Sequence, residues 1–158
     1  MRAAALAMGG DWHDLGGAVA GETDEFVSLQ PLADIDDVSE RGWAAEWVAS
    51  ILSREKIEVT PETKDHVWTA LTSLASAPRE ERTLTGLSVL LQSNVLKRAL
   101  QTYCLGGPYD RLLDAENEAL GSSSVQVFET DGLIGTAVAP AVLSYLFHRI
   151  ESRFDGRP

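Results

Sequence analysis

Residues 39–54, SERGWAAEWVASILSR, contain the clearest helix signal of the sequence and set its fold class. Trp43, Trp47 and Ile51 recur at helical spacing, and small or aliphatic residues beside them widen the stripe to a face that packs on a core. Ser39 is the expected N-cap. Stacking of a base or a ligand on the two tryptophans is the weaker alternative, because aromatic residues at this spacing usually face the interior.

A second helix is expected to begin at Thr60-Pro61, where threonine is a good cap and proline is tolerated at the first helical position. Pro78 ends it, and the charged segment 79–82 connects it to the next helix. The expected buried face of this second helix consists of Val67, Trp68, Leu71, Leu74 and Ala75.

Thr83 is the expected cap of a third helix, which breaks near Ser93-Asn94 and ends at Gly106-Gly107-Pro108. Together with the preceding segments, this predicts an all-helical unit over residues 39–107. Its single cysteine, Cys104, lies on an apolar helix face and is expected to be a buried thiol.

Glycines interrupt residues 1–38, which predict little regular structure. Ala3–Met8 is long enough for one or two helical turns, and Phe26–Leu29 alternates like a short strand before Pro31. A carboxylate run predicts a solvated turn that leads into a helix cap, since it lacks the spacing of a calcium loop. That run consists of Asp34, Asp36 and Asp37.

After residue 108 the pattern changes from helical to mixed. Tyr109–Ala115 predicts a short helix, Val125–Phe128 a strand, and Ala137–Phe154 a helix with Pro140 in its first turn. A strand, a helix and an Asp-Gly turn are the start of an α/β repeat. The expected fold is therefore mostly α with a few β strands, with the α/β part incomplete.

Composition excludes several classes of function. The chain has 158 residues and a formal net charge of −11, a poor basis for binding nucleic acid phosphates or an anionic membrane. One cysteine rules out an internal disulfide framework. The apolar run near the N-terminus is too short for a signal peptide, and no run reaches 18 apolar residues. We therefore expect a soluble protein without a membrane-spanning helix.

Motifs for phosphate or metal binding are absent from the sequence. No G-x-x-x-x-G-K-[ST] loop occurs, and none of the three lysines follows a glycine. The three histidines show no paired spacing, so a metal site is not expected. We predict no catalytic, cofactor-binding or metal-binding residue in this chain.

A few residues leave alternatives open. Cys104 or Glu129 could serve a small hydrolase, and Glu129 ends a strand where α/β sheets bind ligands, but a structural thiol and a plain strand end are favoured. Arg149 and Arg153 lie one turn apart and could hold an anion, although a solvated helix face is the simpler interpretation.

Seven segments occur together in an order that resembles a known family. They are GGDWHDLGG, SLQPLADID, RGWAAEWVASIL, RTLTGL, ALQTYCLGGPYDRLLDAENEAL, VQVFETDGLI and VLSYLFHRIESRFDGRP. The series, which extends over nearly the whole chain, resembles the VirB/CagE/TrbE family of type IV secretion and conjugal transfer ATPases. The resemblance implies a RecA-like P-loop domain with an inserted helical subdomain, and ATP with Mg²⁺ as cofactors of the full-length parent.

On the family pattern, residues 1–38 correspond to an edge of the RecA-like domain, 39–107 to the inserted helical subdomain, and 108–158 to a return strand and helix. The Walker A and Walker B motifs would lie outside the chain, which is expected to be an internal fragment, inactive alone. The resemblance implies secretion channel proteins as partners, self-assembly of the parent, and a cytoplasmic location with attachment to the inner membrane through the secretion complex. The alternative is a standalone helical protein-interaction module without nucleotide chemistry.

Overall fold

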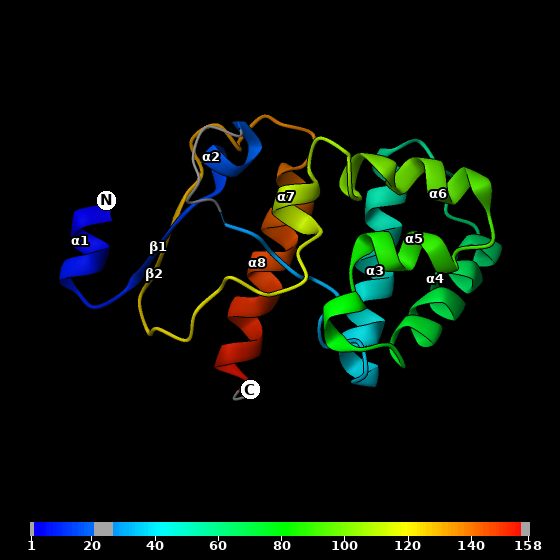
Figure 1. Cartoon of the computed structure of the whole chain (residues 1–158), viewed down its shortest axis with the longest axis horizontal. Coiled ribbons are helices and arrows are strands. Elements are labelled where there is room, and N and C mark those ends of the chain that lie inside the picture. The colour runs from blue at the N-terminus through cyan, green and yellow to red at the C-terminus, as the bar shows by residue number, and fades with distance from the viewer. Residues whose placement is uncertain (1, 21–26, 156–158) are drawn as a thin grey trace.

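The computed structural model describes residues 2–20 and 27–155. Figure 1 shows three parts side by side: a small sheet with helices α1 and α2, a central region with α7 and α8, and a helical unit built from α3 to α6. Within the described residues the chain is mostly helical and has one two-stranded parallel sheet. The coarse prediction of a mostly α fold with few strands is confirmed.

Helices α3 (Val38–Arg54) and α4 (Pro61–Leu74) form the base of the helical unit and pack on each other. Thr60 caps α4 as predicted, its hydroxyl oxygen accepting a hydrogen bond from the amide of Thr63 at 3.2 Å. The expected cap of α3 was wrong by two residues: the carboxylate of Asp37, not Ser39, accepts the first amides. Aspartate is at least as good a cap as serine, so both candidates met the rule.

The buried face predicted for α4 is correct except at Trp68, which is 40% exposed. Its ring lies outside the core, with the guanidinium carbon of Arg41 at 5.6 Å from the ring centroid. Helical position alone put Trp68 beside Val67 on the apolar face, but an indole ring can remain at the edge of a face while its neighbour packs inward.

Short elements complete the helical unit and lead out of it. They are η1 (Arg79–Glu81), α5 (Leu84–Leu90), α6 (Asn94–Leu100), η2 (Gln101–Tyr103) and α7 (Asp110–Leu113). The hydroxyl oxygens of Thr83 and Ser93 cap α5 and α6. The predicted break between these two helices is therefore confirmed, with a serine cap restarting the helix.

The sheet joins β1 (Asp11–Asp14) to β2 (Gln126–Glu129) in parallel, with Asp11 opposite Gln126 and Asp14 opposite Glu129. Helices α1 (Arg2–Ala7) and α2 (Leu15–Ala20) precede and follow β1. The strand expected near residue 125 and the helical turns expected near the N-terminus are confirmed.

The strand expected at 26–29 is wrong for the residues that can be assessed, 27–29, while Phe26 lies outside the described residues. Leu29 is instead an anchor for α7: its amide donates to the carbonyl of Leu112 at 2.8 Å, and its carbonyl accepts from the amide of Ala115 at 3.3 Å. Alternation in this segment reflects burial against a helix end rather than pairing in a sheet.

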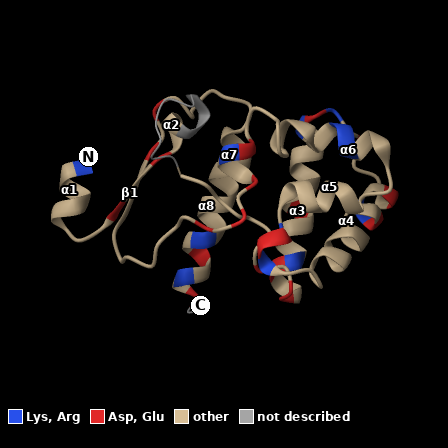
Figure 2. Ribbon diagram, viewed as in Figure 1, with Lys and Arg blue, Asp and Glu red and all other residues tan. Residues whose placement is uncertain are grey.

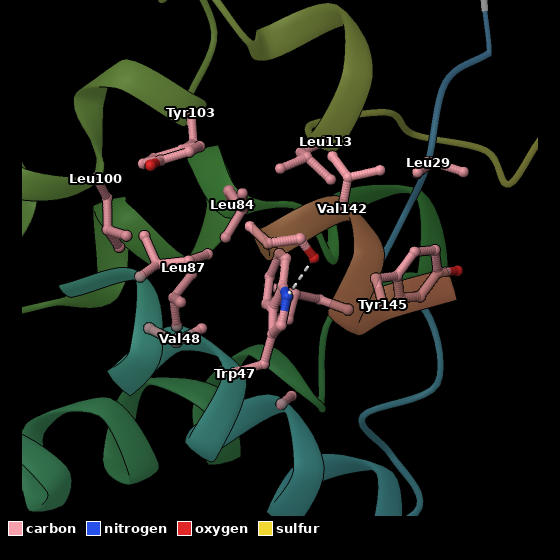
Figure 3. Packing of buried hydrophobic residues seen from close by; sticks show 14 of the residues in the cluster. Leu29, Trp47, Val48, Leu84, Leu87, Leu100, Tyr103, Leu113, Val142 and Tyr145 are labelled. Atoms are coloured by element: carbon pink, nitrogen blue, oxygen red, sulfur yellow. Dashed lines mark hydrogen bonds between the residues drawn. The ribbon is translucent and has the colours of Figure 1, made fainter. Parts of the chain in front are cut away.

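Helix α8 (Ala139–Phe154) packs against α3, with Pro140 in its first turn as predicted. The link is specific as well as hydrophobic, since the indole N–H of the buried Trp47 donates to the carbonyl of Ala141 at 2.9 Å (Figure 3). Leu29, Leu84, Leu113 and Val142 belong to the same cluster of buried residues. The core therefore joins α8 and the 27–37 segment to the helical unit.

The finer assignments stay predictions. The described strands form a parallel pair next to helices, but nothing in their arrangement tests whether they belong to a RecA-like domain. The division into residues 1–38, 39–107 and 108–158 is likewise untested.

Candidate functional site

The aspartate run after Pro31 forms the turn that leads into α3. One carboxylate oxygen of Asp37 accepts hydrogen bonds from the amides of Ser39 at 2.7 Å and Glu40 at 3.1 Å. These are donors that a helix N-terminus leaves unpaired, and the negative charge is favoured there. The turn and the cap were both predicted from the sequence.

The other two aspartates bind arginines from the connector between α4 and α5. Asp34 is 2.5 Å from Arg79, and Asp36 is 2.8 Å from Arg82. Arg82 also donates to the carbonyl of Ala33 at 2.9 Å, and its side chain is only 13% exposed. The interpretation of this run as simply solvated is therefore wrong, because tertiary folding brings opposite charges together across more than forty residues.

Helix α8 adds a second set of contacts to the same place. Arg149 approaches the second carboxylate oxygen of Asp34 at 3.5 Å, and the Nε2 atom of His148 lies 2.9 Å from a carboxylate oxygen of Glu40. The imidazole ring of His148 stacks on Trp43, with ring centroids 4.1 Å apart and planes at 7°. Trp43 therefore packs against the protein's own helix, which supports packing over ligand stacking.

A charged pocket of about 720 Å³ lies over these contacts. It is lined by Asp34, Asp36, Asp37, Ser39, Glu40, Arg79, Arg149 and Ser152. Below it, the Tyr145 hydroxyl donates to Glu118, and burial, followed by the Glu118 charge, raises the pKa of Tyr145 well above its usual value. The site is thus a junction that ties the 30–37 segment, η1 and α8 to α3.

The charged pocket does not fit the triphosphate and Mg²⁺ that the family resemblance implies. Four carboxylates line it against two arginines, and Asp34 already pairs with both of those arginines. A triphosphate would have to displace Asp34 and tolerate three further negative charges, whereas phosphate sites are built from free amides and cations. The arrangement can hold segments together, and we assign no catalytic step to it.

A second pocket, of about 630 Å³, lies on the helical unit where α4, η1 and α5 meet. At its inner edge the carboxylate of Asp114 accepts hydrogen bonds from both the amide and the hydroxyl of Thr85. Burial raises the pKa of Asp114, although these hydrogen bonds oppose the shift. The Thr85 hydroxyl oxygen in turn accepts from the amide of Leu105 at 2.8 Å.

Cys104 lies beside this inner edge and is buried, as predicted. Burial, and secondarily the charge of Asp114, raises the pKa of its thiol to about 11. A nucleophilic cysteine needs a lowered pKa and a basic partner, commonly histidine. The polar side chains that affect this thiol are Asp114, Thr85 and Ser88, so the hydrolase alternative has no support at Cys104.

The remaining candidates do not converge on one site. Glu129 ends β2, opposite Asp14. Arg149 pairs with Asp34, whereas Arg153 donates to the carbonyls of Gly121 and Ser123, so the two arginines do not hold a common anion. Among the described residues, no group of three or more histidine, cysteine or acidic side chains is placed to bind a metal ion.

Sequence reasoning missed the partners that complete the junction. Gln30 donates to the carbonyl of Arg79 at 2.6 Å, and Glu118 accepts from Tyr145. The only available signal was local, an arginine-rich connector and an acidic turn in the same chain, and nothing in either segment indicates that they meet.

No helix in the described residues combines the length and apolarity that crossing a bilayer requires. No protein-family model matches the sequence. Three curated proteins do. A probable conjugal transfer protein TrbE of Sinorhizobium fredii is 36% identical over 155 residues, which are 97% of this chain and 23% of that protein. The conjugal transfer protein TrbE of Rhizobium radiobacter is 33% identical over 156 residues, 97% of this chain and 19% of its own length.

The third relative is the type IV secretion system protein virB4 of Bartonella henselae, 27% identical over 70% of this chain and 15% of its own. The sequence therefore falls within the class of conjugal transfer and type IV secretion proteins. Within that class it is TrbE-like, since both TrbE proteins match it over nearly its whole length. The chain spans about a fifth of the length of these relatives.

Proposed function

We propose that this chain supplies the helical subdomain and the adjoining strand and helix of a TrbE-type ATPase that drives type IV secretion, including conjugal DNA transfer. One observation carries the proposal: two TrbE proteins match 97% of the chain at 36% and 33% identity, and the matched region is only 23% and 19% of their length. Such a match is expected of one structural unit of a larger machine.

By itself the chain should neither bind nor hydrolyse ATP. Phosphoryl transfer requires a P-loop lysine, backbone amides around the phosphates and a carboxylate that holds the metal. The sequence has no P-loop motif, and the carboxylates and arginines of the charged pocket are paired with each other. In this proposal, ATP and Mg²⁺ bind to other regions of the parent protein.

The parent protein would act with type IV secretion channel proteins and assemble with its own copies. Its place would be the cytoplasmic side of the inner membrane, held there through the secretion complex. The naming of its relatives as conjugal transfer and type IV secretion proteins supports this association.

A genetic experiment tests the role in transfer. Removal of the coding sequence for residues 1–158 from a donor strain should reduce the frequency of plasmid transfer, and the wild-type sequence supplied in its place should restore it. A variant that breaks the junction, Asp34→Ala with Arg82→Ala, should restore transfer poorly, whereas Glu62→Gln on the exposed surface of α4 should restore it fully. Undiminished transfer after the removal would contradict the proposal.

A binding experiment tests the nucleotide claim separately. The purified chain should show no saturable binding when it is titrated with a fluorescent ATP analogue and Mg²⁺ under conditions in which an intact P-loop ATPase binds. Micromolar affinity would show that the chain carries a nucleotide site of its own.

A second candidate function is a helical protein-interaction module without any nucleotide role. The apolar pocket on the helical unit favours it, because that pocket belongs to α4, η1 and α5 and is formed without the sheet. The two functions differ in the transfer assay: a module outside the secretion pathway would leave plasmid transfer unchanged when it is removed.

A further inference from the structure

The pocket where α4, η1 and α5 meet presents apolar side chains to solvent. Val89 is 72% exposed, Leu90 is 39% exposed and Leu105 is 80% exposed, and all three line this pocket of about 630 Å³. Apolar side chains that gather around a hollow, rather than being scattered singly, mark sites of interaction. The floor is rigid, since Leu74 and Leu84 beneath it are buried in the core.

The rim of this pocket is acidic. Glu80, Glu81 and Glu116 line it and are exposed, and Asp114 lies at its inner edge. Among the described residues that line the pocket, none is lysine or arginine.

The fold itself separates the charges of the connector Arg79-Glu80-Glu81-Arg82. Both arginines turn toward the aspartate turn, where they pair with Asp34 and Asp36, and both glutamates line the pocket. Basic and acidic positions stand side by side in this connector between α4 and α5 (Figure 2). The arginines therefore do little to neutralise the rim.

We propose that this pocket binds an amphipathic, basic segment of a partner protein. Apolar side chains of that segment would enter between Val89 and Leu105, and its lysines or arginines would meet Glu80, Glu81 and Glu116. A short helix with apolar residues on one face is the usual occupant of such a groove. Charge decides among occupants, because an acidic rim attracts a basic segment and repels nucleic acid or an anionic membrane.

The inference goes beyond the proposed function and does not depend on it, because the pocket needs neither nucleotide nor the rest of a TrbE protein. A second copy of this chain is a poorer occupant: each copy has a formal net charge of −11, so two copies repel each other.

The test uses the full chain and a fluorescein-labelled peptide of about four helical turns, with leucine on one face and lysine on the other. Fluorescence anisotropy measures its affinity. Val89→Ser and Leu105→Ser should each weaken binding about tenfold, as expected for loss of a buried apolar contact. Glu80→Gln with Glu81→Gln should weaken binding at low salt and flatten its salt dependence. Val95→Ser is the matched control, since Val95 is 60% exposed on α6 and does not line this pocket.

Three outcomes would overturn the proposal. Equal binding of a peptide with serine in place of leucine would reduce the interaction to charge alone. Equal losses in Val89→Ser and Val95→Ser would move the contact away from the pocket. Self-association of the chain in sedimentation experiments, abolished by Val89→Ser, would make the pocket an interface between copies. Because the chain itself is the receptor, none of these outcomes depends on plasmid transfer or ATP.

Discussion

Replacement of Trp47 by phenylalanine should destabilise the chain more than any other conservative aromatic change. The indole N–H is the donor of the hydrogen bond from α3 to the Ala141 carbonyl of α8, at 2.9 Å, and the side chain is 3% exposed. Loss of such a bond costs about 0.5–1.5 kcal/mol. Phenylalanine also leaves unfilled the space of about one or two methylene groups, each worth about 0.8 kcal/mol. The expected total is about 2–3 kcal/mol, with incomplete relaxation of the site included.

Urea unfolding followed by far-ultraviolet circular dichroism measures this loss. The midpoint of Trp47→Phe should fall while the slope of free energy against urea stays constant, because the change removes contacts and leaves the extent of unfolding the same. For a chain of this size, the loss corresponds to a decrease in Tm of about 5–10 °C.

Trp68→Phe is the matched control. Its ring is 40% exposed and lies over Arg41, so the same substitution should change stability by less than about 0.5 kcal/mol. If the two variants lose equal stability, the reasoning that places Trp47 at the joint between α3 and α8 is refuted.

Three further changes probe the thiol, the junction and the inner edge of the apolar pocket. At about pH 8, Cys104 should react far more slowly with a thiol reagent in the folded chain than in urea, because burial raises its pKa from 9.0 to about 11. Its share of stability is then complete below pH 9 and lost as the pH rises toward 11, so the urea midpoint of Cys104→Ala should fall less over that window. Arg82→Lys should cost about 1–3 kcal/mol in urea unfolding, because one ammonium cannot replace a guanidinium that donates to three protein oxygens, whereas Arg98→Lys on the exposed surface should be neutral. Asp114→Ala leaves two donors of Thr85 without their acceptor and should lower thermal stability by about 1–3 kcal/mol, and Asp114→Asn should recover some of the loss.

The helices could be predicted because their signals are local. Thr60, Thr83 and Ser93 mark helix starts within three residues of the amides they cap, and the Trp47 stripe needs no knowledge of the rest of the fold. The error at Ser39 shows the limit of such signals: Asp37 satisfies the same rule two positions earlier, and only the path of the preceding turn decides between them.

The charged junction could not be predicted, because its energy depends on distance in space and its residues are far apart in sequence. Asp34 meets Arg79 and Arg149, 45 and 115 residues further along the chain. Each of these segments alone has the composition of a solvated surface. Pairing of their charges follows from how α3, η1 and α8 pack, and that packing is decided by the apolar residues.

Strand β1 failed prediction for a related reason, and the glycines beside it explain how the sheet forms. DWHD lacks β-branched residues and alternation, and its partner β2 begins 112 residues after β1 ends. Gly10 and Gly16 flank it, and at each of them a Cβ atom would collide with the chain near β2: at 2.6 Å from the carbonyl oxygen of Val125 for Gly10 and within the carbonyl group of Asp131 for Gly16. Glycines that predict irregular structure when the sequence is considered alone are therefore the positions that let two distant segments approach closely enough to pair.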